Sequence, residues 1–137
     1  KELQPDEVLK IFTDSYVNIE TPVSLPEIHY VQKANDEITA SVTIDYDGRQ
    51  EVVTADGNGR LDAVSNALKA YLGLDYALVT YTEHALEVRS NSKAVSYVAL
   101  QKGKDLYWGV GIHSDIIRSS ISALVSALNR MMSGQQK

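Results

Sequence analysis

The feature that most constrains the fold of this chain is an order of turns and glycines that occurs twice. Gly48, in a tight turn with Asp47, lies 55 residues before the turn glycine Gly103, and Gly57 lies 54 residues before Gly111. In both halves the pattern predicts strand, tight turn, strand, glycine, polar residue and helix. Coincidence between two ordinary hairpin-plus-helix segments would give the same order, but two matched glycine spacings favour an internal duplication. We therefore predict an α/β (α+β) two-layer fold of two βββα repeats, each helix covering one face of its own sheet.

The first predicted repeat spans about residues 27–73. Apolar residues at every second position indicate a strand, because alternate side chains of a strand share one face. Asp47-Gly48 is a strong hairpin signal, residues 50–55 form the returning strand, and a helix then runs to near Gly73. The alternating positions are Ile38, Ala40, Val42, Ile44 and Tyr46, and the apolar helix positions are Leu61, Val64, Leu68 and Leu72.

The second predicted repeat spans about residues 74–132. Strands are expected over residues 76–81 and 94–100, and a turn at residues 102–104 leads to a returning strand over residues 106–111. Ser114-Asp115 then opens a helix, with Ser114 as the expected N-cap. The apolar positions of this helix are Ile117, Ile121, Leu124, Val125, Leu128 and Met132.

Residues 1–22 are predicted to form a linker helix that precedes the domain of residues 23–137. Pro5 suits a first helical turn, and an apolar stripe extends from Val8 to Tyr16. Thr21-Pro22 and Leu25-Pro26 predict a short, stiff connection without regular structure. Since the chain opens on Lys1 and not on Met, we expect it to be a piece of a longer protein.

The charge balance argues against a nucleic-acid-binding protein. The chain has 18 acidic and 13 basic residues, a formal net charge of −5, whereas nucleic-acid binders normally present a basic face. It has no Cys, which excludes disulfides, thiolate metal sites and Cys nucleophiles. No apolar run approaches the roughly 20 residues that a membrane-spanning helix needs. We expect no nucleic-acid partner and no membrane partner.

The residues that usually carry catalysis are poorly placed in this sequence. The three histidines are His29, His84 and His113, and none has the spacing of a metal-binding motif. Glu83 and His84 are adjacent, but successive strand residues point to opposite faces, so they form no dyad. We therefore predict that this chain is not itself an enzyme and that it binds no metal or other cofactor.

Two glycine segments precede the predicted helices and offer a binding chemistry instead. Gly57-Asn58-Gly59 and Gly109-Val110-Gly111 leave the approach to each helix start without large side chains. Helix N-termini carry unpaired N–H groups and partial positive charge, which suits a small carboxylate. The alternative, about equally supported by spacing alone, is that these glycines only permit unusual backbone angles at tight corners.

Four ordered motifs resemble one family over nearly the whole chain. Residues 57–63, GNGRLDA, are similar to the GNGPxDA signature of the C-terminal regulatory domain of the 2-isopropylmalate synthases. Residues 81–85, YTEHA, resemble its YxEHA segment, and residues 108–120 resemble its WGVGxxxDIxxAS stretch. The closing segment of residues 125–130 is also similar. Arg60 and Ser119 depart from this pattern, since the family usually has Pro and Ala there.

The resemblance implies a dimeric regulatory domain that binds L-leucine as a feedback inhibitor. The full-length enzymes condense acetyl-CoA with 2-oxoisovalerate to give 2-isopropylmalate and CoA in the cytoplasm. Their catalytic unit is a separate N-terminal barrel that needs a divalent metal ion. An isoleucine-sensing domain of citramalate synthase and a purely structural dimerisation module remain as alternatives. Carried over by motif, the leucine site comprises Gly57, Asn58, Gly59, Leu61, Leu78, Tyr81, Ala85, Gly111, Ser114, Asp115, Ile116 and Ile117.

Particular roles follow for these residues if the resemblance holds. The amides near Asn58 to Leu61 would hold the leucine carboxylate, and Asp115 or strand carbonyls would hold its ammonium group. The isobutyl group would be enclosed by Leu61, Leu78, Ala85 and Ile117. For the dimer, we expect the contact to use apolar surface that two thin layers cannot bury, provided by Val125, Met131, Met132 and the Tyr-rich strands.

Overall fold

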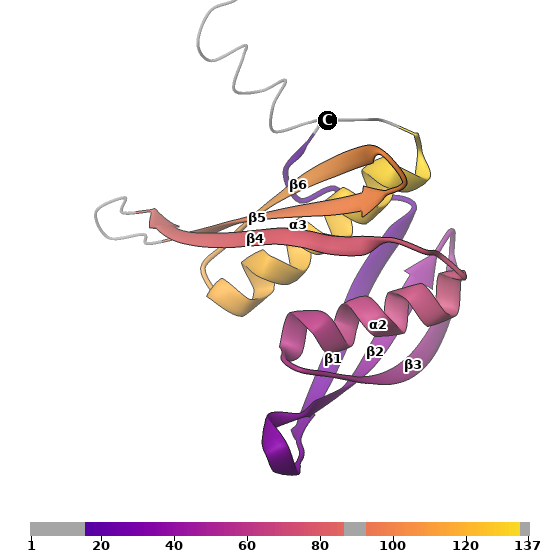
Figure 1. The fold of residues 1–137 in the computed structure, drawn as a ribbon, viewed down its shortest axis with the longest axis vertical. Helices are drawn as coiled ribbons and strands as arrows, with labels where there is room; N and C mark the ends of the chain where they lie inside the picture. Colours follow the sequence, from indigo (N-terminus) through magenta and orange to yellow (C-terminus); the bar gives the residue numbers. More distant parts are fainter. Residues whose placement is uncertain (1–15, 87–92, 135–137) are drawn as a thin grey trace, which may run out of the picture.

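The computed structural model describes residues 16–86 and 93–134, with side chains described outside residues 80–86 (Figure 1). The first repeat contains β1 (Val23–Gln32), a short 3-10 turn η1 (Ala34–Asp36), β2 (Ile38–Tyr46), β3 (Arg49–Gly57) and α2 (Arg60–Leu72). The second contains β4 (Ala77–Leu86), β5 (Lys93–Lys102), β6 (Asp105–His113) and α3 (Ile116–Met132). The predicted pair of βββα repeats is therefore confirmed.

Each repeat forms its own antiparallel sheet, covered on one face by its own helix. The strand orders are β1-β2-β3 and β4-β5-β6, so the hairpin strand β2 or β5 is central in each. Helix α2 packs on β2 and β3, and α3 packs on β5 and β6 (Figure 1). In β2, Ala40, Val42 and Ile44 are buried while the intervening residues are half-buried, as their alternation predicts.

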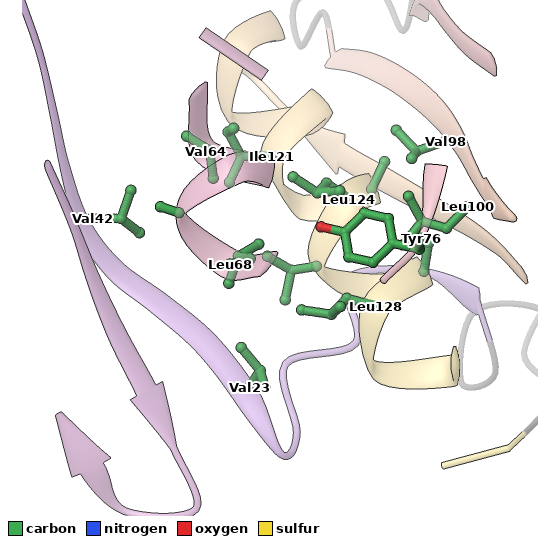
Figure 2. Close-up of a cluster of buried hydrophobic side chains, with 14 of the residues drawn as sticks. Val23, Val42, Val64, Leu68, Tyr76, Val98, Leu100, Ile121, Leu124 and Leu128 are labelled. Carbon is green, nitrogen blue, oxygen red and sulfur yellow. The ribbon is translucent and has the colours of Figure 1, made fainter. Parts of the chain in front are cut away.

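The two repeats share one hydrophobic core. Figure 2 shows Val42 of β2, Val64 and Leu68 of α2, and Leu124 of α3 in one cluster with Leu100 of β5. All five side chains are fully buried. Because the two helices also contact each other, neither sheet-and-helix unit is packed independently of its neighbour.

Three strand glycines allow the helices to approach their sheets closely. A Cβ atom on Gly57 would collide with the backbone of Ala63 in α2. A Cβ atom on Gly111 would collide with the backbone of Ser119 in α3, and one on Gly109 with the backbone of the same helix further along. The predicted alternative of unusual backbone angles is wrong for Gly57, Gly109 and Gly111, because none of them has a positive φ. Their close approach to the helix backbone, which the sequence analysis did not consider, explains why each is a glycine.

The predicted stiff connection at Leu25-Pro26 is wrong, because both residues lie in β1. The sheet register shifts between Ser24 and Glu27, next to Pro26. Proline cannot donate to a sheet ladder, and it is tolerated here since β1 is an edge strand with an irregularity at that point.

Residues 1–15 of the predicted linker helix lie outside the described part of the chain. The predicted helix is wrong for the residues after Tyr16, because Val17 forms a bridge with Val110 of the edge strand β6. Asn18 extends this contact: its Nδ2 donates to the Ile112 carbonyl at 3.1 Å, and its Oδ1 accepts from the Ile112 N–H at 3.0 Å. The segment after residue 16 thus packs along the second sheet.

The apolar residues that remain at the surface differ from those predicted. Val125 and Met131 are buried within the shared core, and Met132 packs against it, because α3 lies between its own sheet and the first repeat. The large apolar side chains that stay exposed include Trp108 and Leu106, on β6 of the second sheet. Within the described residues, no helix is long and apolar enough to cross a membrane.

Candidate functional site

Helix α2 starts without a side chain to cap it. Its N-cap residue is Gly59, with extended backbone angles (φ 176°, ψ 175°) and no side-chain hydrogen bond. Asp62, three residues later, turns back so that its Oδ2 accepts from the Asn58 N–H at 2.9 Å. A helix start of this kind presents N–H groups and partial positive charge to whatever lies in front of it.

A hollow of about 440 Å³ lies at this helix start. It draws its walls from both repeats: β2 and α2 of the first, and β4 and α3 of the second. Five of its ten lining residues are aliphatic, and the polar ones are Asn58, Arg60 and Asp62 around the start of α2 and Ser120 on α3. The lining residues are Ile38, Asn58, Gly59, Arg60, Leu61, Asp62, Leu78, Ile117, Ser120 and Ile121.

A second, smaller hollow of about 280 Å³ adjoins the first. It lies between β1 and α3 and is lined by Tyr30, Asp115, Arg118 and several aliphatic residues. The two hollows share Arg60, Ile117 and Ile121. Burial raises the pKa of the Tyr30 phenol, and the positive charges of Arg60 and Arg118 partly oppose that rise.

The start of α3 differs from the start of α2. Asp115, and not the predicted Ser114, is the N-cap, and its Oδ1 accepts from the Ile117 N–H at 2.9 Å. The Asp115 N–H in turn donates to His113 Nδ1 at 3.0 Å. The starts of α2 and α3 are therefore not equivalent, because Asp115 caps α3 with its own side chain whereas the N-cap of α2 is Gly59.

Five of the predicted site residues meet in the larger hollow: Asn58, Gly59, Leu61, Leu78 and Ile117. They come from α2, β4 and α3 and from the loop before α2, so residues of both repeats line this hollow.

The other predicted residues are placed differently. Asp115 lines the neighbouring hollow, while Ser114 and Ile116 are exposed beside it. Gly57 and Gly111 line neither hollow, because each lies beneath a helix. The strand β4 contains Tyr81 and Ala85, whose side chains lie outside the described part of the structure.

Sequence reasoning missed five residues of the larger hollow: Ile38, Arg60, Asp62, Ser120 and Ile121. Asp62 could have been found, because an acidic residue three positions after an N-cap typically turns back to the helix start. Ser120 and Ile121 lie one turn after Ile117 on α3, so a search by helical spacing would have identified them.

The described residues offer binding groups and little that could act in catalysis. His29 and Glu27 are 3.1 Å apart, but both side chains are largely exposed on β1. Among the residues that the structure describes, no three His, Asp or Glu side chains are placed to hold a metal ion. An open helix start facing an aliphatic hollow is suited to a small ligand with a carboxylate and an apolar body.

Comparison with known proteins agrees with this geometry. Residues 2–132 match the family model of the LeuA allosteric (dimerisation) domain. The chain is 47% identical over 134 residues to 2-isopropylmalate synthase of Desulfitobacterium hafniense (strain Y51), covering 96% of the chain and 24% of that protein. It is 42% identical over 140 residues to the synthase of Helicobacter hepaticus (strain ATCC 51449 / 3B1), covering 96% of the chain and 25% of that protein.

The chain thus spans about a quarter of the length of these curated relatives. The family match leaves no part of the 137 residues for a catalytic barrel. By its sequence, its two βββα repeats and its glycine-opened helix start, the chain belongs to the LeuA allosteric (dimerisation) domain family.

Proposed function

We propose that this chain is the leucine-sensing, dimerising regulatory domain of a 2-isopropylmalate synthase. The observation that carries the proposal is the hollow at the uncapped start of α2, which combines backbone N–H groups with an aliphatic wall. Such a site suits an aliphatic amino acid, because the carboxylate of the ligand faces the positive helix end while its apolar side chain is buried away from water. The names of the relatives support the choice of enzyme.

In this proposal the leucine carboxylate lies on the amides of Gly59 to Leu61 that open α2, since the Asn58 N–H donates to Asp62. The isobutyl group packs against Leu61, Leu78 and Ile117, which all line the hollow, and against Ala85. For the ammonium group Asp62 is the better candidate, because it lines the larger hollow whereas Asp115 lines the neighbouring one.

The proposed whole protein joins this domain to an N-terminal catalytic barrel. That barrel would condense acetyl-CoA with 2-oxoisovalerate in the cytoplasm, as the first committed step of leucine synthesis. We place the divalent metal ion of that reaction in the barrel, outside this chain. Leucine bound at the regulatory dimer would then lower the activity of the distant barrel as feedback inhibition.

Titration calorimetry of the purified domain with L-leucine and L-isoleucine tests this proposal. Binding of L-leucine in preference to L-isoleucine is expected. A preference for L-isoleucine would favour the sensor of a citramalate synthase, and heat from neither amino acid would favour a purely structural dimerisation module. CoA release by the domain alone from acetyl-CoA and 2-oxoisovalerate would contradict its assignment as a regulatory part.

A further inference from the structure

Arg60 has a position at the site that no other cation shares among the described residues. It is the first helical residue of α2 and lines both hollows. Its guanidinium lies over the ring of Tyr30, with 5.4 Å between the Arg60 Cζ atom and the ring centroid. Arg118, by contrast, lines only the smaller hollow.

The charges of the larger hollow make Arg60 available to a ligand. Among its lining residues Arg60 carries the positive charge and Asp62 the negative one. The Asp62 carboxylate accepts from the Asn58 N–H, and within the described chain Arg60 forms no ion pair. Among the described residues, no carboxylate therefore lies within ion-pair distance of the Arg60 guanidinium.

We infer that Arg60 is a specificity-determining residue that binds the carboxylate of the effector together with the amides at the start of α2. This inference rests on the proposed function and deepens it. A guanidinium offers paired N–H donors that match a carboxylate, and it adds a full charge to the partial charge of the helix end. The site then selects branched aliphatic acids with a free carboxylate over their amides or alcohols.

A merely structural role for Arg60 is the competing explanation. Its contact with the Tyr30 ring could only hold the start of α2 against β1, with no direct effect on the ligand. The two roles differ in one measurable respect: a carboxylate anchor discriminates between leucine and leucinamide, whereas a structural contact affects the binding of both equally.

Calorimetry with L-leucine and L-leucinamide on the wild-type domain, Arg60→Gln and Arg60→Lys tests the inference. Arg60→Gln should bind leucine about tenfold more weakly, the loss expected for one charge-assisted contact, while the affinity for leucinamide stays the same. Arg60→Lys, which keeps the charge without the planar fork, should lose less. Arg118→Gln is the matched control and should leave leucine affinity unchanged, because Arg118 does not line this hollow.

Other results would overturn the inference in distinguishable ways. Wild-type affinity for leucine in Arg60→Gln, or equal losses for leucine and leucinamide, would remove Arg60 as an anchor and leave the proposed function standing. If leucinamide gives no heat with the wild-type domain or with Arg60→Gln, the leucine affinity of Arg60→Lys decides. An affinity within about threefold of wild type supports Arg60 as the carboxylate anchor. A loss equal to that of Arg60→Gln overturns the inference. A wild-type domain that binds no leucine would overturn the proposed function and this inference with it.

Discussion

The side chain of Asn129 on α3 forms two hydrogen bonds with the backbone of Val23, the first residue of β1: it accepts one and donates the other. Its Oδ1 accepts from the Val23 N–H at 2.9 Å, and its Nδ2 donates to the Val23 carbonyl at 2.9 Å. The same Nδ2 also donates to the Ile19 carbonyl at 2.8 Å. Both Asn129 and Val23 are almost fully buried, so a helix of the second repeat fixes where the first sheet begins.

Replacing Asn129 with Ala should therefore destabilise the whole domain. The change leaves the buried N–H and carbonyl of Val23 without partners, which costs about 3 kcal/mol in unfolding free energy. Urea denaturation measures this loss. Asn66→Ala is the control on α2, because the Asn66 side chain makes one exposed hydrogen bond to the Asp56 carbonyl and should cost less than about 1 kcal/mol.

Gly111→Ala should be strongly destabilising, whereas Gly59→Ala should not. A Cβ atom at position 111 collides with the α3 backbone at Ser119, while nothing lies within 4 Å of a Cβ atom at position 59. Overpacking of this kind costs about 1–3 kcal/mol or more, because helix and strand must separate. Thermal unfolding of the two variants beside wild type gives the comparison, and equal melting temperatures would contradict the close packing of α3 on β6.

Stability should fall at high pH partly because of Tyr76. Burial raises the pKa of this phenol from 10.0 to about 12, and its hydroxyl is 2.9 Å from Ser65 Oγ. In the unfolded chain the phenol ionises near its ordinary pKa, while in the folded domain it stays neutral up to about 12. The stabilisation is thus complete below the ordinary pKa and is lost as pH rises through the window between the two values.

Tyr76→Phe isolates this contribution from the other tyrosines. At neutral pH the variant should be less stable by about 1 kcal/mol, because it lacks the hydrogen bond to Ser65. Its unfolding free energy should then fall less steeply than that of wild type above the ordinary phenol pKa. Parallel denaturation curves at several alkaline pH values provide the measurement, and identical slopes would mean that Tyr76 does not titrate differently on folding.

The proposed dimer should persist in solution at tens of micromolar protein. Trp108 and Leu106 keep 37% and 40% of their surface exposed on β6, which leaves apolar area available to a partner. Sedimentation equilibrium measures the mass, and Trp108→Lys should shift the distribution towards monomer if this face takes part. A wild-type monomer across this range would count against the dimerising role.

The repeats were predictable because both signals that define them are local. Alternation in Ala40, Val42 and Ile44 fixed the buried face of β2, and Gly73 was correctly expected at the end of α2, where its φ is 65°. The failures came from tertiary context. Leu25-Pro26 suggested a break, but an edge strand with an irregular register accommodates a proline.

The site was predictable only in part for the same reason. Asn58, Gly59 and Leu61 are adjacent in sequence, and they meet Leu78 and Ile117 in one hollow. The second glycine segment suggested an equivalent site, yet its glycines serve helix packing and Asp115 caps the helix. No periodicity in the sequence distinguishes a glycine that lies beneath a helix from one that faces a ligand.

The central claim is that a leucine carboxylate binds at the start of α2, and Gly59→Asp tests it most directly. Position 59 has room for a side chain and extended backbone angles, so the fold should be kept. An Asp there can cap α2 and would stabilise it by up to about 1 kcal/mol. Its carboxylate would accept the hydrogen bonds from the backbone N–H groups that the leucine carboxylate needs.

Leucine affinity of the Gly59→Asp domain, measured by calorimetry beside Gly59→Asn and Gly59→Ala, is the deciding measurement. We predict a loss of about tenfold to hundredfold or more for Gly59→Asp, because one charge-assisted contact is lost and a like charge is added. Gly59→Asn, which caps without charge, should lose less, and Gly59→Ala should bind nearly as wild type does. In a full-length synthase, Gly59→Asp should leave turnover intact and abolish inhibition by leucine. Wild-type leucine affinity in a Gly59→Asp domain with an unchanged circular dichroism spectrum would show that the ligand binds elsewhere.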